Sequence, residues 1–250
     1  MRALLCGSLV VTVLWPATAS AGPPYLTDDP DPVDYQTFEI IPAYMLDRSS
    51  AGSEIDGPIA DFNYGIWPDM HLNIQGGFAH ALPDDGPSEF GVSDLRVALK
   101  WRVHKETDDS PEIAIYPAVE LPTGNAGKGL GNGQVWYQFP VWLEKNWDQG
   151  WSSYGGGGWT LNRARGQRDY FYGGWQLQKQ LNYRWNLGGE VYSQGSTGSG
   201  VVGWTALNLG GGYKFNDQAS LIFSFGHSFA GASNTLGYVG VDLTWGSSPP

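Results

Sequence analysis

The sequence has almost no cysteine, few charged side chains and no long apolar run in its main part. Its 250 residues include one cysteine, Cys6, and only 16% of them are charged. After residue 21, no apolar stretch reaches the roughly 18 residues that a membrane-spanning helix needs, and no helical period occurs. A disulfide framework, a thiol metal site and a helical membrane span are therefore excluded for the mature chain.

The first 21 residues are typical of a secretory signal peptide. Arg2 supplies a positive charge, residues 4–15 are apolar, and 19–21 are small residues at the spacing that a signal peptidase accepts. We expect cleavage after Ala21, with Ala19 as an alternative, so that Cys6 is removed.

Beyond this leader, apolar and polar side chains alternate repeatedly, as they do on strands with one apolar face. In 183–191 one face carries Tyr183, Trp185, Leu187 and Val191, and the other carries Arg184, Asn186 and Glu190. The pattern predicts about twelve strands, near 36–46, 56–66, 69–80, 90–104, 111–121, 133–145, 151–161, 168–180, 183–194, 202–214, 218–229 and 235–245.

Short turns alternate with long loops along these strands, and the chain is rich in aromatic residues. Transmembrane barrels have short periplasmic turns and long external loops, with aromatic residues at both membrane boundaries. The composition fits, with 12 tryptophans and 36 glycines. We therefore expect an all-β, closed antiparallel up-and-down transmembrane barrel over 35–246. A soluble two-layer β-sandwich in the periplasm is the alternative.

The segments outside the expected barrel are short. Residues 22–34 are rich in proline and aspartate, and we expect a periplasmic lead-in that closes the lower mouth of the barrel. We expect residues 247–250 to be a C-terminal tail. The last strand ends on the aromatic residue Trp245, and such an ending resembles the assembly signal of outer-membrane barrels. We therefore expect the barrel assembly machinery as a partner.

The net charge argues against nucleic acid as a partner. The full chain has 14 basic and 25 acidic residues, for a net charge of -11. Without the leader, which contains one arginine and no acid, 13 basic and 25 acidic residues leave -12. Nucleic-acid-binding domains carry basic patches instead.

Several stretches resemble a family of bacterial outer-membrane proteins, the transporter-like barrels of the MetA-pathway of phenol degradation. The resemblance implies an outer-membrane barrel that moves small, aromatic or hydrophobic compounds, and it transfers no functional residues. The chain lacks the long N-terminal hatch of hydrophobic-compound channels, since only about a dozen residues precede the first strand. The stretches are PPYLTDDPDPV (23–33), DLRVALKWRV (94–103), PAVELPTGNAGKGLGNG (117–133), QFPVWLEKNW (138–147), GGGGWTLNRARGQRDYFYGGWQLQKQL (155–181) and LGGGYKFNDQASLIFSFGHSFAG (209–231).

Charged and polar residues on the inward faces are the candidate functional residues. They predict either a constriction that selects solutes by charge and size, or a set of paired charges that fills the barrel and closes it; the sequence supports both equally. The candidates are Asp61, His71, Asp94, Arg96, Lys100, Arg102, Glu112, Glu120, Arg184 and Glu190.

Three other patterns predict no site. The glycine-rich 122–133 lacks a phosphate-loop spacing and a following helix. His227 and Ser228 are adjacent and so point to opposite faces, whereas a hydrolase dyad needs one face. The aspartates of 28–34 are stiffened by prolines, which disfavours wrapping a cation. We expect no catalytic residue, no metal and no cofactor.

These features together favour an outer-membrane channel for a small solute. A non-conducting structural or adhesive barrel is the main alternative, and a lipid hydrolase ranks third. We expect the barrel to lie in outer-membrane lipid and lipopolysaccharide. The arginines of 162–168 suit the phosphates of lipopolysaccharide, although basic loops of this kind are more often simply solvated.

Overall fold

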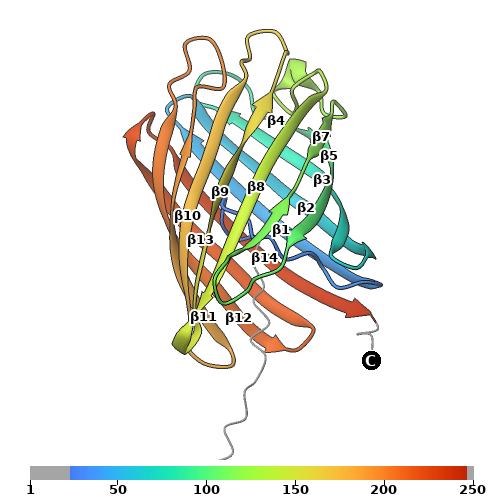
Figure 1. Ribbon diagram of the computed structural model, residues 1–250. Helices are drawn as coiled ribbons and strands as arrows, with labels where there is room; N and C mark the ends of the chain where they lie inside the picture. The colour runs from blue at the N-terminus through green and yellow to red at the C-terminus, as the bar shows by residue number, and fades with distance from the viewer. Residues whose placement is uncertain (1–22, 247–250) are drawn as a thin grey trace, which may run out of the picture.

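The computed structural model describes residues 23–246. Most of residues 37–246 lie in β-strands, as the alternation of apolar and polar side chains predicts. Neighbouring strands pair antiparallel, and the last pairs with the first, which closes the barrel (Figure 1). The strands are β1 (Thr37–Ser49), β2 (Gly52–Trp67), β3 (Met70–Pro83), β4 (Glu89–Val92), β5 (Leu95–His104), β6 (Glu112–Ile115), β7 (Ala118–Leu121), β8 (Trp136–Trp147), β9 (Trp151–Leu161), β10 (Tyr170–Gln180), β11 (Trp185–Gln194), β12 (Trp204–Asn216), β13 (Ala219–Gly231) and β14 (Thr235–Gly246).

The fourteen strands occupy twelve positions around the barrel, which confirms the predicted closed twelve-strand antiparallel fold. β4 and β5 both pair with β3 and continue one another across a break at 93–94. β6 and β7 both lie between β5 and β8, and Pro117 lies at the break that separates β6 from β7. Proline has no N–H to give to the ladder, so a strand breaks or bulges there.

Two single-turn 3-10 segments, η1 (Ala126–Lys128) and η2 (Asp148–Gly150), complete the regular structure of residues 23–246. No helix in this range has the length and apolarity that crossing a membrane requires.

The side chains face as the alternation predicts. On β11, Leu187 and Val191 are 42% and 45% exposed on the outside, whereas Glu190 is 1% exposed. A sheet with apolar residues outward and polar residues buried inward has the lipid-facing arrangement, because a soluble sheet would bury the apolar face. Other exposed apolar side chains include Phe139, Val141, Trp175, Leu177, Leu207, Leu209, Phe225 and Val239.

The two ends of the barrel differ in their connections. The short turns 68–69, 148–150, 181–184 and 217–218 and the connection 105–111 lie at the end where β14 finishes. The longer loops 84–88, 122–135, 162–169 and 195–203 project from the opposite end, together with two short turns, 50–51 and 232–234 (Figure 1). Exposed aromatic side chains border the short-turn end: Trp67, Trp101, Trp147, Trp151, Tyr183, Trp185, Phe215 and Trp245. Such a belt is typical of a membrane–water boundary.

The described part of the predicted lead-in lies elsewhere than expected. Residues 23–34 run inside the barrel, where they contact β3, β5 and β11, and do not form a cap outside its mouth. The segment enters the barrel for an electrostatic reason, because its aspartates pair with cations on the inner wall. The predicted signal peptide (1–21), Gly22 and the tail (247–250) lie outside the described residues.

We predict that Leu209→Arg destabilises the membrane-folded protein by about 2–4 kcal/mol, because arginine near the bilayer midplane is costly. Leu209 is 62% exposed near the middle of β12, and Val202, in the preceding loop, is equally exposed at 62%. Val202→Arg is therefore the matched control, with an expected change near zero. Urea unfolding in lipid vesicles measures both. Equal effects of the two substitutions would contradict a lipid-facing wall.

Candidate functional site

The lumen is occupied by residues 23–34, here named the inner segment. Its first part is held by Glu190 on β11, whose carboxylate accepts hydrogen bonds from the backbone amides of Leu26 (2.9 Å) and Thr27 (2.7 Å). Asn208 on β12 donates to the same carboxylate at 2.6 Å. Charge-assisted bonds of this kind are stronger than neutral ones, so Glu190 is an anchor for the segment.

Lys100 on β5 holds the middle of the inner segment. Its ammonium lies 3.0 Å from a carboxylate oxygen of Asp28 and 3.1 Å from one of Asp29. Lys100 is 3% exposed and Asp29 is 1% exposed, and the ammonium also lies 5.0 Å from the centre of the Tyr116 ring. A charge this deeply buried persists only with a partner. Each partner therefore requires the other inside the barrel.

The end of the segment is held by a second cation. Arg102 donates to Asp31 at 2.5 Å, to Asp69 at 2.5 Å and to Glu112 at 3.3 Å. Asp69 lies in the turn between β2 and β3. Partial burial raises the pKa of the Asp69 carboxyl, but the hydrogen bonds from Arg102 and Lys105 outweigh this and lower the pKa below its ordinary value.

A histidine and two glycines shape the remaining contacts. His71 Nδ1 accepts a hydrogen bond from the backbone amide of Val33 at 2.9 Å. A Cβ at Gly174 would lie 2.3 Å from Oγ1 of Thr27, and a Cβ at Gly188 would lie 3.1 Å from the hydroxyl of Tyr25. The wall is therefore recessed where the segment approaches it closely.

The predicted ladder of opposite charges forms in part. Arg96 is directly paired with Glu120 between β5 and β7, with 3.9 Å between charged atoms, and Arg102 reaches Glu112 as expected. Lys100 has its partners on the inner segment instead. Asp61 is buried and accepts a hydrogen bond from Asn73 at 2.5 Å.

Two predicted lumen residues lie outside this cluster. Arg184 is exposed in the turn before β11, where it donates to the hydroxyl of Tyr213 at 3.0 Å. The strand begins at Trp185, two residues later than the predicted start at 183. Asp94 lies at the break between β4 and β5, and it accepts backbone hydrogen bonds from Gly124 (2.9 Å) and Asn132 (2.7 Å). It fixes the loop 122–132.

Sequence analysis missed Asp28, Asp29 and Asp31 as lumen residues. The available signal was the charge balance of the inner faces: Arg96 and Arg102 have acidic partners on the next strand, but Lys100 has none there. The acidic segment before the first strand supplies the missing charge.

A line of aromatic rings on the inner wall was also missed. The four rings are Trp142 on β8, Tyr172 on β10, Tyr192 on β11 and Trp204 on β12; β9, which lies between β8 and β10, contributes none. Consecutive ring centres are 6.5, 6.4 and 5.7 Å apart. We name these four residues the aromatic ladder. It begins where β12 leaves the loop 195–203, and Trp142 at its other end packs in the same cluster as Tyr116.

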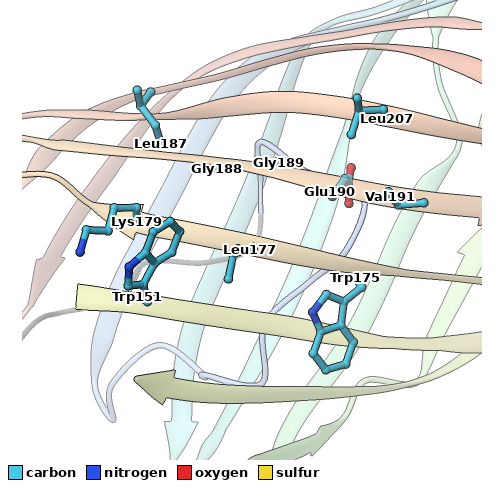
Figure 2. Close-up of a pocket in the computed structure, with 10 residues that line it drawn as sticks. All are labelled: Trp151, Trp175, Leu177, Lys179, Leu187, Gly188, Gly189, Glu190, Val191 and Leu207. Carbon is cyan, nitrogen blue, oxygen red and sulfur yellow. The ribbon is translucent and has the colours of Figure 1, made fainter. Parts of the chain in front are cut away.

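An open groove of about 550 Å³ lies on the outer wall over β9–β12 (Figure 2). Trp151 and Lys179 lie side by side at one end, with the ammonium 5.0 Å from the ring centre. Glu190 borders the groove, but its carboxylate binds the inner segment on the lumen side. The groove belongs to the lipid-facing wall and not to the lumen.

His227 and Ser228 point to opposite sides of β13, as their adjacency predicts. His227 is exposed with its Nδ1 2.8 Å from the hydroxyl of Thr235, and Ser228 is buried and donates to the backbone of Ala232. The two side chains therefore do not form a dyad with each other.

Solved structures share this fold. An outer membrane channel from Pseudomonas putida F1 has a TM-score of 0.66 at 13% identity, with 87% of this chain and 98% of that chain covered. The KdgM porin complexed with oligogalacturonate has a TM-score of 0.58 at 10% identity, covering 83% and 99%. The translocator domain of the autotransporter NalP from Neisseria meningitidis has 0.51 at 13%, covering 82% and 88%. These likenesses show the closed antiparallel β-barrel fold.

The family follows from the sequence itself. Residues 26–244 match the family described as "MetA-pathway of phenol degradation". Because the match spans most of the chain, the protein belongs to this family, and the resemblance noted above is confirmed. No curated protein matches the chain significantly.

We predict that Lys100→Met releases the inner segment, since it leaves the buried carboxylates of Asp28 and Asp29 without a cation. Breaking a buried ion pair in this way costs about 3–5 kcal/mol. The amide hydrogens of Leu26, Thr27 and Val33 should then exchange much faster. Arg184→Met, which removes an exposed cation, is the control and should leave exchange unchanged. Unchanged protection in Lys100→Met would show that the ion pairs do not hold the segment.

Proposed function

We propose that the protein is an outer-membrane channel that passes a small aromatic solute, with the inner segment narrowing its lumen. The observation that carries the proposal is the aromatic ladder on the inner wall of the barrel, beside buried charged and amide side chains. Large aromatic side chains normally face lipid in such proteins. Here Trp142, Tyr192 and Trp204 are only 3%, 6% and 8% exposed and lie on the inner wall.

The ladder offers a path of ring faces toward the inner segment. Aromatic side chains bind other rings edge-to-face or offset-stacked, at centre distances of about 4.5–7 Å. At its inner end lies Tyr116, whose ring is approached by Arg96 at 5.2 Å and by Lys100 at 5.0 Å. A ring that carries a negative group would meet aromatic faces first and cations next. The charged lumen residues then act as the selectivity region.

A non-conducting barrel is the second candidate, and the packing of the interior favours it specifically. Tyr154, Gln176, Glu144 and Glu190 are each at most 2% exposed, and the inner segment packs inside the same wall. A twelve-stranded barrel is intermediate in bore between filled eight-stranded and open sixteen-stranded barrels. Conduction by the folded protein separates the two candidates.

We also propose that the protein contacts lipopolysaccharide through the external loop 162–168. Arg163, Arg165 and Arg168 are exposed there, and Arg163 also pairs with Asp169 at 2.8 Å. Arginine forks suit phosphate groups. Export by a cleaved signal peptide and insertion by the barrel assembly machinery belong to the same proposal.

We predict that Trp142→Leu lowers the preference for an aromatic solute over a non-aromatic one of equal size and charge. The expected loss is about two- to tenfold, since one aromatic contact contributes about 0.5–1.5 kcal/mol beyond its area. Swelling of proteoliposomes in benzoate and in cyclohexanecarboxylate measures it. Trp175→Leu, the same change at a ring 58% exposed on the outer wall, is the control. No swelling in either solute would favour the non-conducting barrel.

Reversing Arg96 and Arg102 together to Glu should shift the ion preference in planar bilayers toward cations, because two inner-wall charges change sign. Reversing Arg163 and Arg165 in the external loop changes the net charge equally and should have a smaller effect. Ion preference that stays unaltered on reversal of Arg96 and Arg102 would reject them as selectivity residues.

A further inference from the structure

Three carboxylates from separate parts of the chain meet inside the barrel near its short-turn end. Asp31 belongs to the inner segment, Glu112 to β6 and Glu144 to β8. Glu112 and Glu144 are directly paired across the two strands, so they share the inner face. One oxygen atom from each of the three carboxylates lies within 4.8 Å of the others.

The cations nearby do not balance these charges. Arg102 contacts Asp31 at 2.5 Å and Glu112 at 3.3 Å, but it also serves Asp69 at 2.5 Å. Within residues 23–246, Glu144 forms no ion pair. Asp29 and Asp31 lie close enough to repel it. With all three carboxylates ionised, the cluster therefore carries more negative charge than its protein partners neutralise.

Buried oxygen atoms without hydrogen-bond partners lie on Glu144 and on two residues near it. Glu144 is 2% exposed; its Oε1 accepts a hydrogen bond from Asn146 at 2.9 Å, and its Oε2 has no partner. Oδ2 of Asp29 and the hydroxyl of Tyr154, which is paired with Glu144 across β8 and β9, are also buried without a hydrogen bond. Buried polar atoms are normally satisfied by protein, water or an ion.

We propose that Asp31, Glu112 and Glu144 bind one Ca²⁺ ion. All the available donors are oxygens, which suit hard cations, and Ca²⁺ binds them at about 2.3–2.6 Å. The three carboxylate oxygens lie within 4.8 Å of one another, close enough to bind one ion together. Mg²⁺ gives up its water ligands reluctantly and usually keeps several of them, so a buried site of three protein carboxylates favours Ca²⁺. The wall supplies the ligands that the proline-stiffened segment could not provide alone.

The ion would join the inner segment to the barrel wall. Asp31 is the one ligand on the segment, and the other two are on fixed strands, so Ca²⁺ holds the segment in the lumen and its removal frees Asp31. The consequence for solute passage rests on the proposed channel function. The binding itself does not, because it is measured without conduction.

The test measures Ca²⁺ binding to the full-length protein folded in detergent, by equilibrium dialysis with ⁴⁵Ca²⁺. We expect one ion per chain and competition by Mg²⁺ only at much higher concentration. Glu144→Gln should weaken binding more than about tenfold, since it removes one of three charged ligands. Glu120→Gln is the matched control: it also removes a carboxylate of the inner wall, but one paired with Arg96, and should leave binding unchanged.

A second measurement follows the segment itself. Ca²⁺ should slow amide hydrogen exchange of residues 23–34 in the unsubstituted protein and not in Glu144→Gln. Equal Ca²⁺ affinity in both proteins, or no binding to the unsubstituted protein at millimolar Ca²⁺, would overturn the site. Ca²⁺ binding and slowed exchange without any effect on solute passage would support the site and count against the channel function.

Discussion

The interior of this barrel depends on the contact between Lys100 and the two aspartates of the inner segment. An ammonium that is 3% exposed needs compensating charge, and the carboxylates at 3.0 and 3.1 Å supply it. The pairing explains why a proline- and aspartate-rich stretch enters the lumen, and it fixes the depth that the stretch reaches. The anchors at Glu190, Arg102 and His71 then set its course along the wall.

The same alternation that makes the wall gives it two different surfaces. Outward positions are apolar, with an aromatic belt at the short-turn end, because lipid is their solvent. Inward positions carry charged and amide side chains, the aromatic ladder from Trp204 to Trp142, and a small apolar cluster of Ile41, Ala43, Ile59 and Ile222. The interior therefore combines a ring-lined side, a cationic region near Tyr116 and an acidic cluster around Glu144. In the proposed function, the ring-lined side serves solute passage, the cationic region serves selection, and the acidic cluster controls the inner segment.

Much of the architecture was predictable, because strand periodicity is a local property. The twelve strand positions, the outward faces and the pairs Arg96–Glu120 and Arg102–Glu112 follow from alternation and antiparallel neighbours. The place of 23–34 did not follow, since a segment without periodicity is positioned by long-range charge pairs. Arg184 and Asp94 were misplaced because alternation cannot show where a strand begins or bends. The aromatic ladder was hidden because its members are spread over separate strands.

The most direct test of this account is a double-mutant cycle between Lys100→Met and the paired change Asp28→Asn with Asp29→Asn. Hydrogen exchange of the Leu26 and Thr27 amides reports the docking of the inner segment in each protein. The account predicts a coupling free energy of about 1–3 kcal/mol, because each side loses its effect once the other is absent. Additive effects, with coupling near zero, would contradict it.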